Sequence, residues 1–236
     1  MTRLHDKTFF RFGIAQKLVK DGAIGRPLSL RVVSPTAGWG AVSPPNYAYL
    51  QDKSNGATLS TIAGGHTLAA IEAVVGAFAE VGARSSILVK QMTLMGTDET
   101  VERTCADHLL VHGRHDSGCV SSLEVVGGVS DVPFQFELRG TKASLAISGG
   151  HVGGFQAGYL TVSTNPPSAP QPAPVAPDIP VQSANVAELW ARFASDIANG
   201  TRTLPDFDRA VRLTRLLDAI DLSSEQGRVV ELADSP

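Results

Sequence analysis

The chain has 236 residues, of which 43% are hydrophobic and 18% are charged, and its formal net charge at pH 7 is −3. This size and composition suit one globular domain with a sizeable core. The mixed charges exclude the basic face of a nucleic-acid-binding or membrane-surface protein. Charged side chains are spread through the first twenty residues, which therefore contain no long apolar run. The two cysteines, Cys105 and Cys119, form no CxxC motif. We therefore expect a cytoplasmic protein with neither a secretory signal nor a disulfide framework nor a metal site.

The first quarter of the chain predicts one helix, one strand and a long loop. Residues 9–20 have helical spacing and end at an Asp-Gly pair. Residues 26–35 alternate apolar and polar positions, as in a strand, and end at a proline. Residues 36–55, TAGWGAVSPPNYAYLQDKSN, are rich in glycine, proline and aromatic residues. A loop of this length in a compact domain is usually functional or covers a site.

The stretch STIAGGHTLAAIEAVVG, residues 60–76, places one histidine between a glycine pair and an apolar helix. The apolar spacing after His66 predicts a helix that ends at Gly76. His66 is then expected at or near the helix N-terminus, where the dipole disfavours an imidazolium ion and favours an anionic ligand. Glycines at this point let the backbone approach a ligand closely. His66 is therefore the candidate acid/base residue, and the alternative is a histidine that merely caps the helix.

The middle of the chain consists of short β-rich segments separated by glycine turns, at residues 79–90, 105–115, 118–128, 132–140, 143–150 and 158–164. In PFQFELRG, Phe134, Phe136 and Leu138 face one way and the polar residues face the other, which indicates an antiparallel sheet buried on one side. The proline-rich residues 165–184 predict an extended strap.

Two amphipathic helices and a short strand are expected at the C-terminal end. The first helix is predicted to begin at Asn185, with Glu188 completing a capping box. The second covers residues 205–227, and residues 228–232 form the strand. The predicted fold class is α+β, with an open, mostly antiparallel sheet and helices packed on one face.

Candidate ligand-binding residues come from the long loop and from the glycine pair. Rings with polar tips suit a small-molecule pocket, although such residues also pack beneath their own loop. The candidates are Trp39, Asn46, Tyr47, Tyr49 and Gly65. His108 and His112 share a strand face but lie about 13 Å apart at ~3.3 Å per residue, so they cannot hold one metal ion together.

Four segments, in this order, resemble the C-terminal domain of the Gfo/Idh/MocA oxidoreductases, in the branch of the galactose/lactose regulatory proteins. They are DGAIGRPLSLRVVS, NGATLSTIAGGHTLAAIEAVVGAFAEV, FELRGTKASLAISGG and PDFDRAVRLTRLLDAI. The resemblance runs over residues 9–230. It implies a single domain, residues 1–236, in which residues 1–26 hold the helix that links the two domains of the family.

Members of that family normally begin with a dinucleotide-binding domain, which carries a GxGxxG turn and a catalytic Glu-Lys-Pro segment. This chain has no GxGxxG turn and no Lys-Pro dipeptide. The glycine-rich SGGHVGGFQAG lies between predicted strands, which is typical of a hairpin and not of a phosphate site. The resemblance therefore implies the second half of such an enzyme, with no cofactor bound by this chain alone.

Residue by residue, the family's GGH histidine lies beside the substrate and near the nicotinamide, a place that the resemblance gives to His66. Many relatives carry an aspartate three residues later, where this chain has Ala69. The resemblance also implies a homodimer in which the open sheet faces pair.

Three hypotheses about function remain open. The first is a stand-alone substrate-binding and dimerisation domain for a small polar or carbohydrate-like molecule, which acts with a nucleotide-binding partner subunit or as a regulator. The second is a cofactor-independent, redox-neutral lyase, isomerase or cyclase that uses His66 as its acid/base. The third is a fragment without activity.

Overall fold

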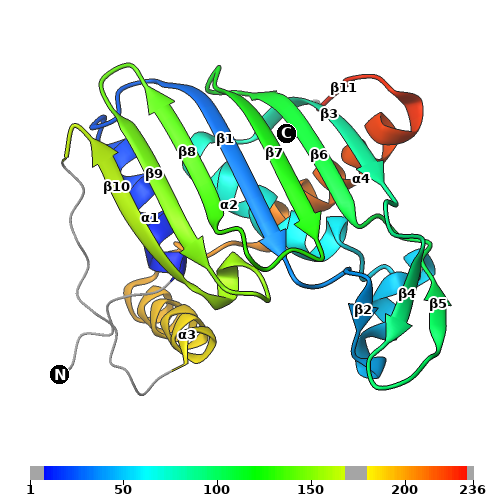
Figure 1. Ribbon diagram of the computed structural model, residues 1–236. Helices are drawn as coiled ribbons and strands as arrows, with labels where there is room; N and C mark the ends of the chain where they lie inside the picture. Colours follow the sequence, from blue (N-terminus) through cyan, green and yellow to red (C-terminus); the bar gives the residue numbers. More distant parts are fainter. Residues whose placement is uncertain (1–7, 168–179, 233–236) are drawn as a thin grey trace.

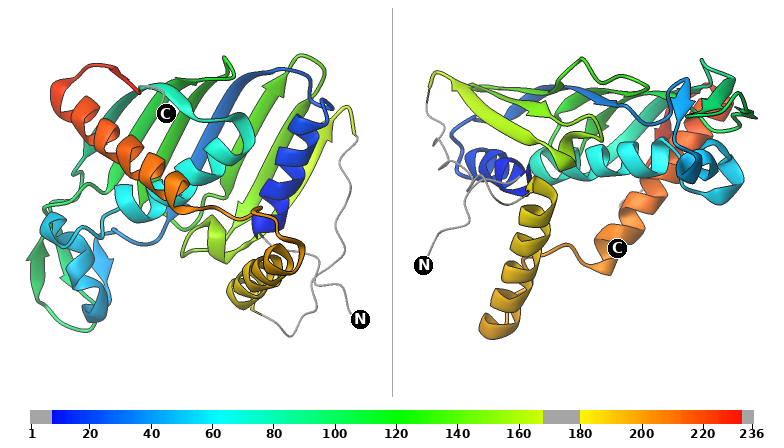
Figure 2. Two further views of the ribbon diagram at one scale, coloured as in Figure 1. Left: turned by 180° about the vertical axis from the view of Figure 1, so that it is seen from behind. Right: turned by 60° about the horizontal axis from the view of Figure 1, so that its bottom comes forward.

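In the computed structural model, which describes residues 8–167 and 180–232, one large sheet carries the helices on a single face (Figure 1, Figure 2). Its strand order is β10-β9-β8-β1-β7-β6-β3-β11. β1 and β7 pair in parallel, and the other neighbouring strands described are antiparallel. The predicted α+β class is confirmed. The strands are β1 (Pro27–Thr36), β3 (Phe78–Ser86), β6 (His108–His115), β7 (Val120–Gly127), β8 (Phe134–Gly140), β9 (Ser144–Gly150), β10 (Tyr159–Asn165) and β11 (Val230–Glu231).

The core lies between the sheet and the helices. Phe134, Phe136 and Leu138 of β8 are buried, and the polar residues between them face the other side, so the predicted alternation is confirmed. Phe12 of helix α1 (Thr8–Lys20) packs edge-on against the rings of Phe134 and Phe136, with centroids 6.1 and 5.5 Å apart. Such aromatic pairs add to the free energy of apolar burial and fix how the helix lies on the sheet.

Three helices lie against the sheet and one projects from it. α1, α2 (Gly65–Val75) and the second half of α4 (Phe207–Gln226) cover the inner face. α3 (Val181–Asn199) and the first turns of α4 extend away from this layer (Figure 2). Within the described residues, no helix is both long enough and apolar enough to cross a membrane.

A small three-stranded sheet lies beside the large one (Figure 1). It consists of β2 (Val42–Ser43), β4 (Gln91–Leu94) and β5 (Thr100–Glu102) in the order β2-β4-β5. The sequence did not indicate β4 and β5, because they are short and their apolar residues do not alternate over a useful length. The expected long loop is folded in part, since it also contains the 3₁₀ turns η1 (Pro45–Gln51) and η2 (Lys53–Asn55).

The start of α3 differs from the prediction. The helix begins at Val181, with Pro180 in the N-cap position, and Asn185 lies inside it. The side-chain amide of Asn185 donates a hydrogen bond to the Gln156 carbonyl (2.9 Å), so this residue serves a tertiary contact and not a capping box. Of the proline-rich strap predicted over residues 165–184, residues 168–179 lie outside the described part of the chain.

Candidate functional site

His66 is the second residue of α2, near its N-terminus as predicted, but the helical segment as a whole begins before this helix. A π-helical turn, η3 (Ser60–Gly64), runs directly into α2. The Gly64 amide donates to the Leu59 carbonyl five residues back (2.9 Å). Gly64 and Gly65 both have helical backbone angles, with φ of −61° and −57°. The glycine pair therefore does not form a sharp turn, and the N-terminal end of the helix lies before His66. Single π turns are frequent at functional sites.

Buried hydroxyl groups attach this segment to the sheet. Thr67 is fully buried, and its Oγ1 donates to the Ala63 carbonyl (2.7 Å). Because that donation uses the only hydroxyl proton of Thr67, the Ser34 hydroxyl of β1 must donate in the second bond, at 2.9 Å between the two oxygens. His66 is next to Thr67 in the chain, so its backbone is held rigidly over the sheet.

The side chain of His66 is exposed. No hydrogen bond or ion pair of its ring is found among the described residues. The protein atoms around it nevertheless lower the pKa of His66 by desolvation, since water stabilises the charged ring less well here. The imidazole is therefore mainly neutral near pH 7, in the form that can accept a proton or donate one hydrogen bond.

Charged groups of α4 lie beside α2. The guanidinium Nη2 of Arg209 donates to the carbonyl of Ala69, one turn after His66, at 3.0 Å. Burial raises the pKa of Glu72, an effect that the Phe78 amide and the positive charges of Arg209 and Arg212 partly offset. The sequence analysis did not single out Arg209, because a lone arginine on an amphipathic helix carries no local signal for a site.

The loop residues are divided between the core and the surface. Trp39 is buried, its indole N–H donates to the Leu50 carbonyl (3.1 Å), and its φ is +59°. This is the packed arrangement that the sequence left open as an alternative. Asn46, Tyr47 and Tyr49 are exposed on η1. A contact of any of them with a ligand stays a prediction.

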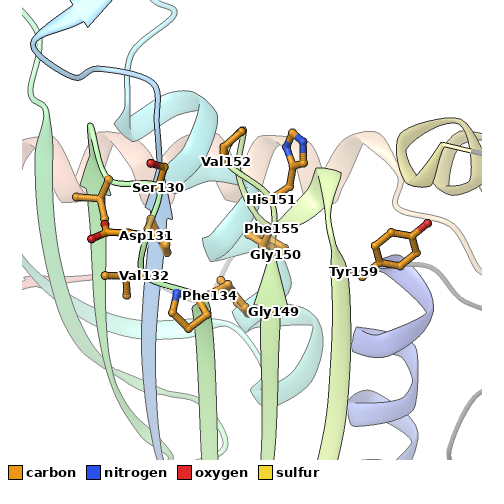
Figure 3. A pocket seen from close by; sticks show the side chains of 13 residues that line it. Ser130, Asp131, Val132, Phe134, Gly149, Gly150, His151, Val152, Phe155 and Tyr159 are labelled. Carbon is orange, nitrogen blue, oxygen red and sulfur yellow. The ribbon is translucent and has the colours of Figure 1, made fainter.

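A cavity of about 440 Å³ lies elsewhere, at the end of the sheet (Figure 3). One wall is the loop at residues 129–133, and the other is the glycine-rich segment at residues 149–155, which is the turn of the β9–β10 hairpin as predicted. His151 stands at its rim, where its Nδ1 accepts a hydrogen bond from the Gly153 amide (3.0 Å). His66 does not line this cavity. No local sequence pattern indicates this cavity, because its walls come from separate segments of the chain.

The remaining histidines and cysteines form no metal site in the part of the chain that the structure describes. His108 and His112 lie on the outer face of the sheet, and the Nε2 of His108 is 2.9 Å from a carboxylate oxygen of Glu124. Cys105 and Cys119 are free and buried. Burial raises the pKa of the Cys119 thiol to about 11, which makes it unreactive near pH 7.

A family model and two known proteins match this chain. The model of the Gal80p C-terminal domain matches residues 13–149. The galactose/lactose metabolism regulatory protein GAL80 of Kluyveromyces lactis is 29% identical over 162 residues, which cover 63% of this chain and 34% of that protein. Dehydrogenase aclE of Aspergillus oryzae is 24% identical over 235 residues, which cover 90% of this chain and 58% of that protein.

Solved structures share the fold. The Gal80p super-repressor mutant E351K from Saccharomyces cerevisiae superposes with a TM-score of 0.82 at 20% identity, over 95% of this chain and 63% of that one. The apo form of levoglucosan dehydrogenase superposes with a TM-score of 0.73 at 21% identity, over 97% of this chain and 66% of that one. The chain thus spans between a third and two thirds of the length of these relatives. With the family model, the motifs and the fold in agreement, the chain belongs to the Gal80p C-terminal-domain family, whose fold it shares with the Gfo/Idh/MocA-type oxidoreductases.

Proposed function

We propose that this chain is the ligand-binding and assembly half of an oxidoreductase-type protein. It holds a small polar or carbohydrate-like molecule beside His66 and works with a separate nucleotide-binding module that covers the helical side. The relatives support both an enzymatic and a regulatory use of such a protein, since one is named a dehydrogenase and another a regulatory protein.

The observation that carries this proposal is an apolar stripe on α3 and on the first turns of α4, facing solvent on the helical side of the sheet. Phe207 is 90% exposed, Ile197 69% and Trp190 63%. The other exposed apolar side chains of the stripe are Val186, Leu189, Phe193 and Val211. A soluble domain rarely exposes so many large apolar side chains together unless they form an interaction site.

The stripe is held in place before any partner binds. The Asp196 carboxylate, near the end of α3, accepts hydrogen bonds from the Thr201 and Thr203 hydroxyls and from the Thr203 and Leu204 amides. These bonds, led by the one from Thr201, lower the pKa of Asp196. They fix the turn between α3 and α4, so little conformational entropy is lost when a partner docks.

The redox-neutral enzyme is the second candidate, and the electrostatics of His66 favour it. Desolvation lowers the pKa of His66, so the exposed ring is present near pH 7 in the neutral form that can accept a proton. Such an enzyme needs no nucleotide and therefore no partner that carries one.

Affinity purification from the source organism distinguishes the two candidates. The intact chain is expected to retain, in equal amount, a protein with a GxGxxG turn and a Glu-Lys-Pro segment, and the pair is expected to bind NADH in a calorimetric titration. The chain alone is expected to bind neither NAD nor NADP, because it lacks a phosphate-binding turn. A variant with Trp190, Ile197 and Phe207 replaced by serine should keep its fold and lose the partner. Micromolar binding of either nucleotide to the chain alone would contradict the proposal.

His66→Ala tests the ligand site itself. The ring is exposed and unpaired in the described structure. The free energy of unfolding of the variant, measured in urea, should therefore lie within about 0.5 kcal/mol of that of the parent chain. It should nevertheless lose ligand binding. Catalysis by the chain alone that disappears in His66→Ala would instead support the redox-neutral enzyme.

A further inference from the structure

Arg209 contacts the part of α2 that carries His66, although Arg209 belongs to α4 and is far from α2 in the sequence. It is in the first turn of α4, where the Asp206 carboxylate accepts the Arg209 backbone N–H (2.9 Å). Its guanidinium reaches across to the Ala69 carbonyl (3.0 Å). Residues three apart on a helix are surface neighbours, with Cβ atoms about 5–6 Å apart, so this positive charge stands about one helical turn from His66.

The residue of α2 that Arg209 contacts is small. Ala69 is half-buried and carries only a methyl group, and Gly65, one turn earlier, is buried and has no side chain. A Cβ atom built on Gly65 would meet no atom within 4 Å. The helix thus carries small residues next to His66 and at the point where Arg209 contacts it, so neither residue at these positions has a side chain long enough to come between the two groups.

Most of the guanidinium remains available. An arginine has five N–H donors, and the structure records one of them in use, on the Ala69 carbonyl. In the described residues no carboxylate forms an ion pair with Arg209. Glu72 acts on it only at longer range, and Asp206 uses a carboxylate oxygen for its cap. Because His66 is mainly neutral, Arg209 is the permanent positive charge beside it.

We infer that the molecule held beside His66 carries a carboxylate, and that Arg209 is the residue that binds it. The planar guanidinium accepts a carboxylate through two parallel hydrogen bonds. The neutral imidazole then contacts a hydroxyl or carbonyl of the same molecule. This inference rests on the proposed ligand site at His66 and narrows its ligand from small polar molecules in general to sugar acids and similar hydroxy acids.

A matched pair of probes tests the inference with the intact chain. Glucuronate and glucose share a sugar ring and differ by the carboxylate. Each is titrated into isotope-labelled protein while NMR follows the His66 ring and the amides of residues 64–70. Glucuronate is expected to bind at least about ten-fold more tightly than glucose, because only glucuronate has a carboxylate that can accept charge-assisted hydrogen bonds from Arg209. Arg209→Gln should remove that preference, and Arg212→Gln, one turn further along α4, should keep it.

A second variant guards against a structural effect of losing Arg209. Ala69→Asp leaves the arginine in place but sets a carboxylate beside it, so the preference for glucuronate should disappear although the fold is kept. Equal binding of both probes that is lost in His66→Ala but unchanged in Arg209→Gln would overturn this inference and leave the proposed site intact. If neither probe shifts the His66 signals at tens of millimolar, both the inference and the proposed site fail.

Discussion

His115, the last residue of β6, is a buried histidine whose protonation opposes folding. Its Nδ1 lies 2.8 Å from the Gly76 carbonyl and its Nε2 lies 2.9 Å from the Ser121 hydroxyl oxygen. The carbonyl can only accept, so Nδ1 carries the proton, and Nε2 accepts from Ser121 in the neutral ring. Burial lowers the pKa of His115, and the hydrogen bonds to the Gly76 and Ala77 backbones only partly oppose this effect.

The sign of the resulting pH dependence follows from proton counting. Below about pH 6.5 the unfolded chain protonates this histidine and the folded chain does not, so the free energy of unfolding falls as the pH is lowered. The fall ends once the pH is below the folded pKa. One group gives at most about 1.4 kcal/mol per pH unit. His66 adds a contribution of the same sign, because its pKa is lowered too.

Urea titrations between about pH 7.5 and pH 5 measure this dependence, with the window set by the ordinary histidine pKa. His115→Gln provides the comparison, because an amide can donate to Gly76 and accept from Ser121 without titrating. The variant should show a clearly shallower slope than the parent chain. His66→Ala measures the separate contribution of the exposed histidine, which has the same sign. An unchanged slope in His115→Gln would exclude His115 as the source.

The positions and contacts of single side chains were the features least predictable from the sequence. His66 was identified as a candidate because the glycine pair and the apolar helix mark it locally. The helical turn η3 that precedes it was missed, because no local pattern in residues 60–64 marks a π turn. The burial of Trp39 and the approach of Arg209 to Ala69 depend on which distant segments meet, and no local pattern records that.

At the scale of elements, the small sheet is attached to the large one by a buried ion pair. Arg103, just after β5, and Asp107, just before β6, are 2.7 Å apart, and both side chains are almost fully buried. The Arg103 guanidinium also donates to the side-chain oxygen of Gln51, and the Asp107 carboxylate accepts the Leu88 and Val89 amides. A buried ion pair contributes little net free energy, but the removal of one partner leaves an uncompensated charge.

Asp107→Ala should therefore lower the free energy of unfolding by about 3–5 kcal/mol, measured in urea. Hydrogen exchange should show the largest loss of protection at the β4 amides, because the small sheet loses its attachment. The control is Glu137→Ala, which removes the exposed pair that Glu137 makes with Arg31 at 3.3 Å. That change should cost less than about 1 kcal/mol. Similar losses in the two variants would show that the buried pair does not hold the small sheet.

The strands of the large sheet were the most predictable elements, because apolar and polar residues alternate along each strand and this local pattern indicates one buried and one exposed face. The stripes on α3 and α4 show the limit of such patterns. Helical spacing identified an apolar face that runs from Phe207 to Ile220, and the structure buries only its second half. Periodicity indicates which side chains share a face, but it does not indicate what covers that face.

At the scale of the whole molecule, the sheet has one face without helices (Figure 2). The outward side chains of its central strands are a mixture of apolar and paired charged groups. Leu110 is 44% exposed and Val120 52%. The charges nearby are paired, as in Arg114 with Glu80 at 2.9 Å. A face of this kind can be buried against a copy of itself with few unpaired charges, and we expect two such sheets to pack at about 10 Å in a symmetric homodimer.

Sedimentation at micromolar concentration is therefore expected to give the mass of a dimer. Leu110→Lys should give a monomer with an unchanged fold, because the lysine stays on an exposed face of the free chain, where it lies opposite Glu124 on one neighbouring strand and Arg84 on the other. In the dimer the same lysine would be buried at the centre of the contact, where an extra charge is costly. Ile197→Lys, on the apolar stripe of α3, is the matched control and should remain dimeric. If Ile197→Lys dissociates the dimer and Leu110→Lys does not, the helical side is the interface, and the stripe is occupied by a second copy instead of a nucleotide-binding partner.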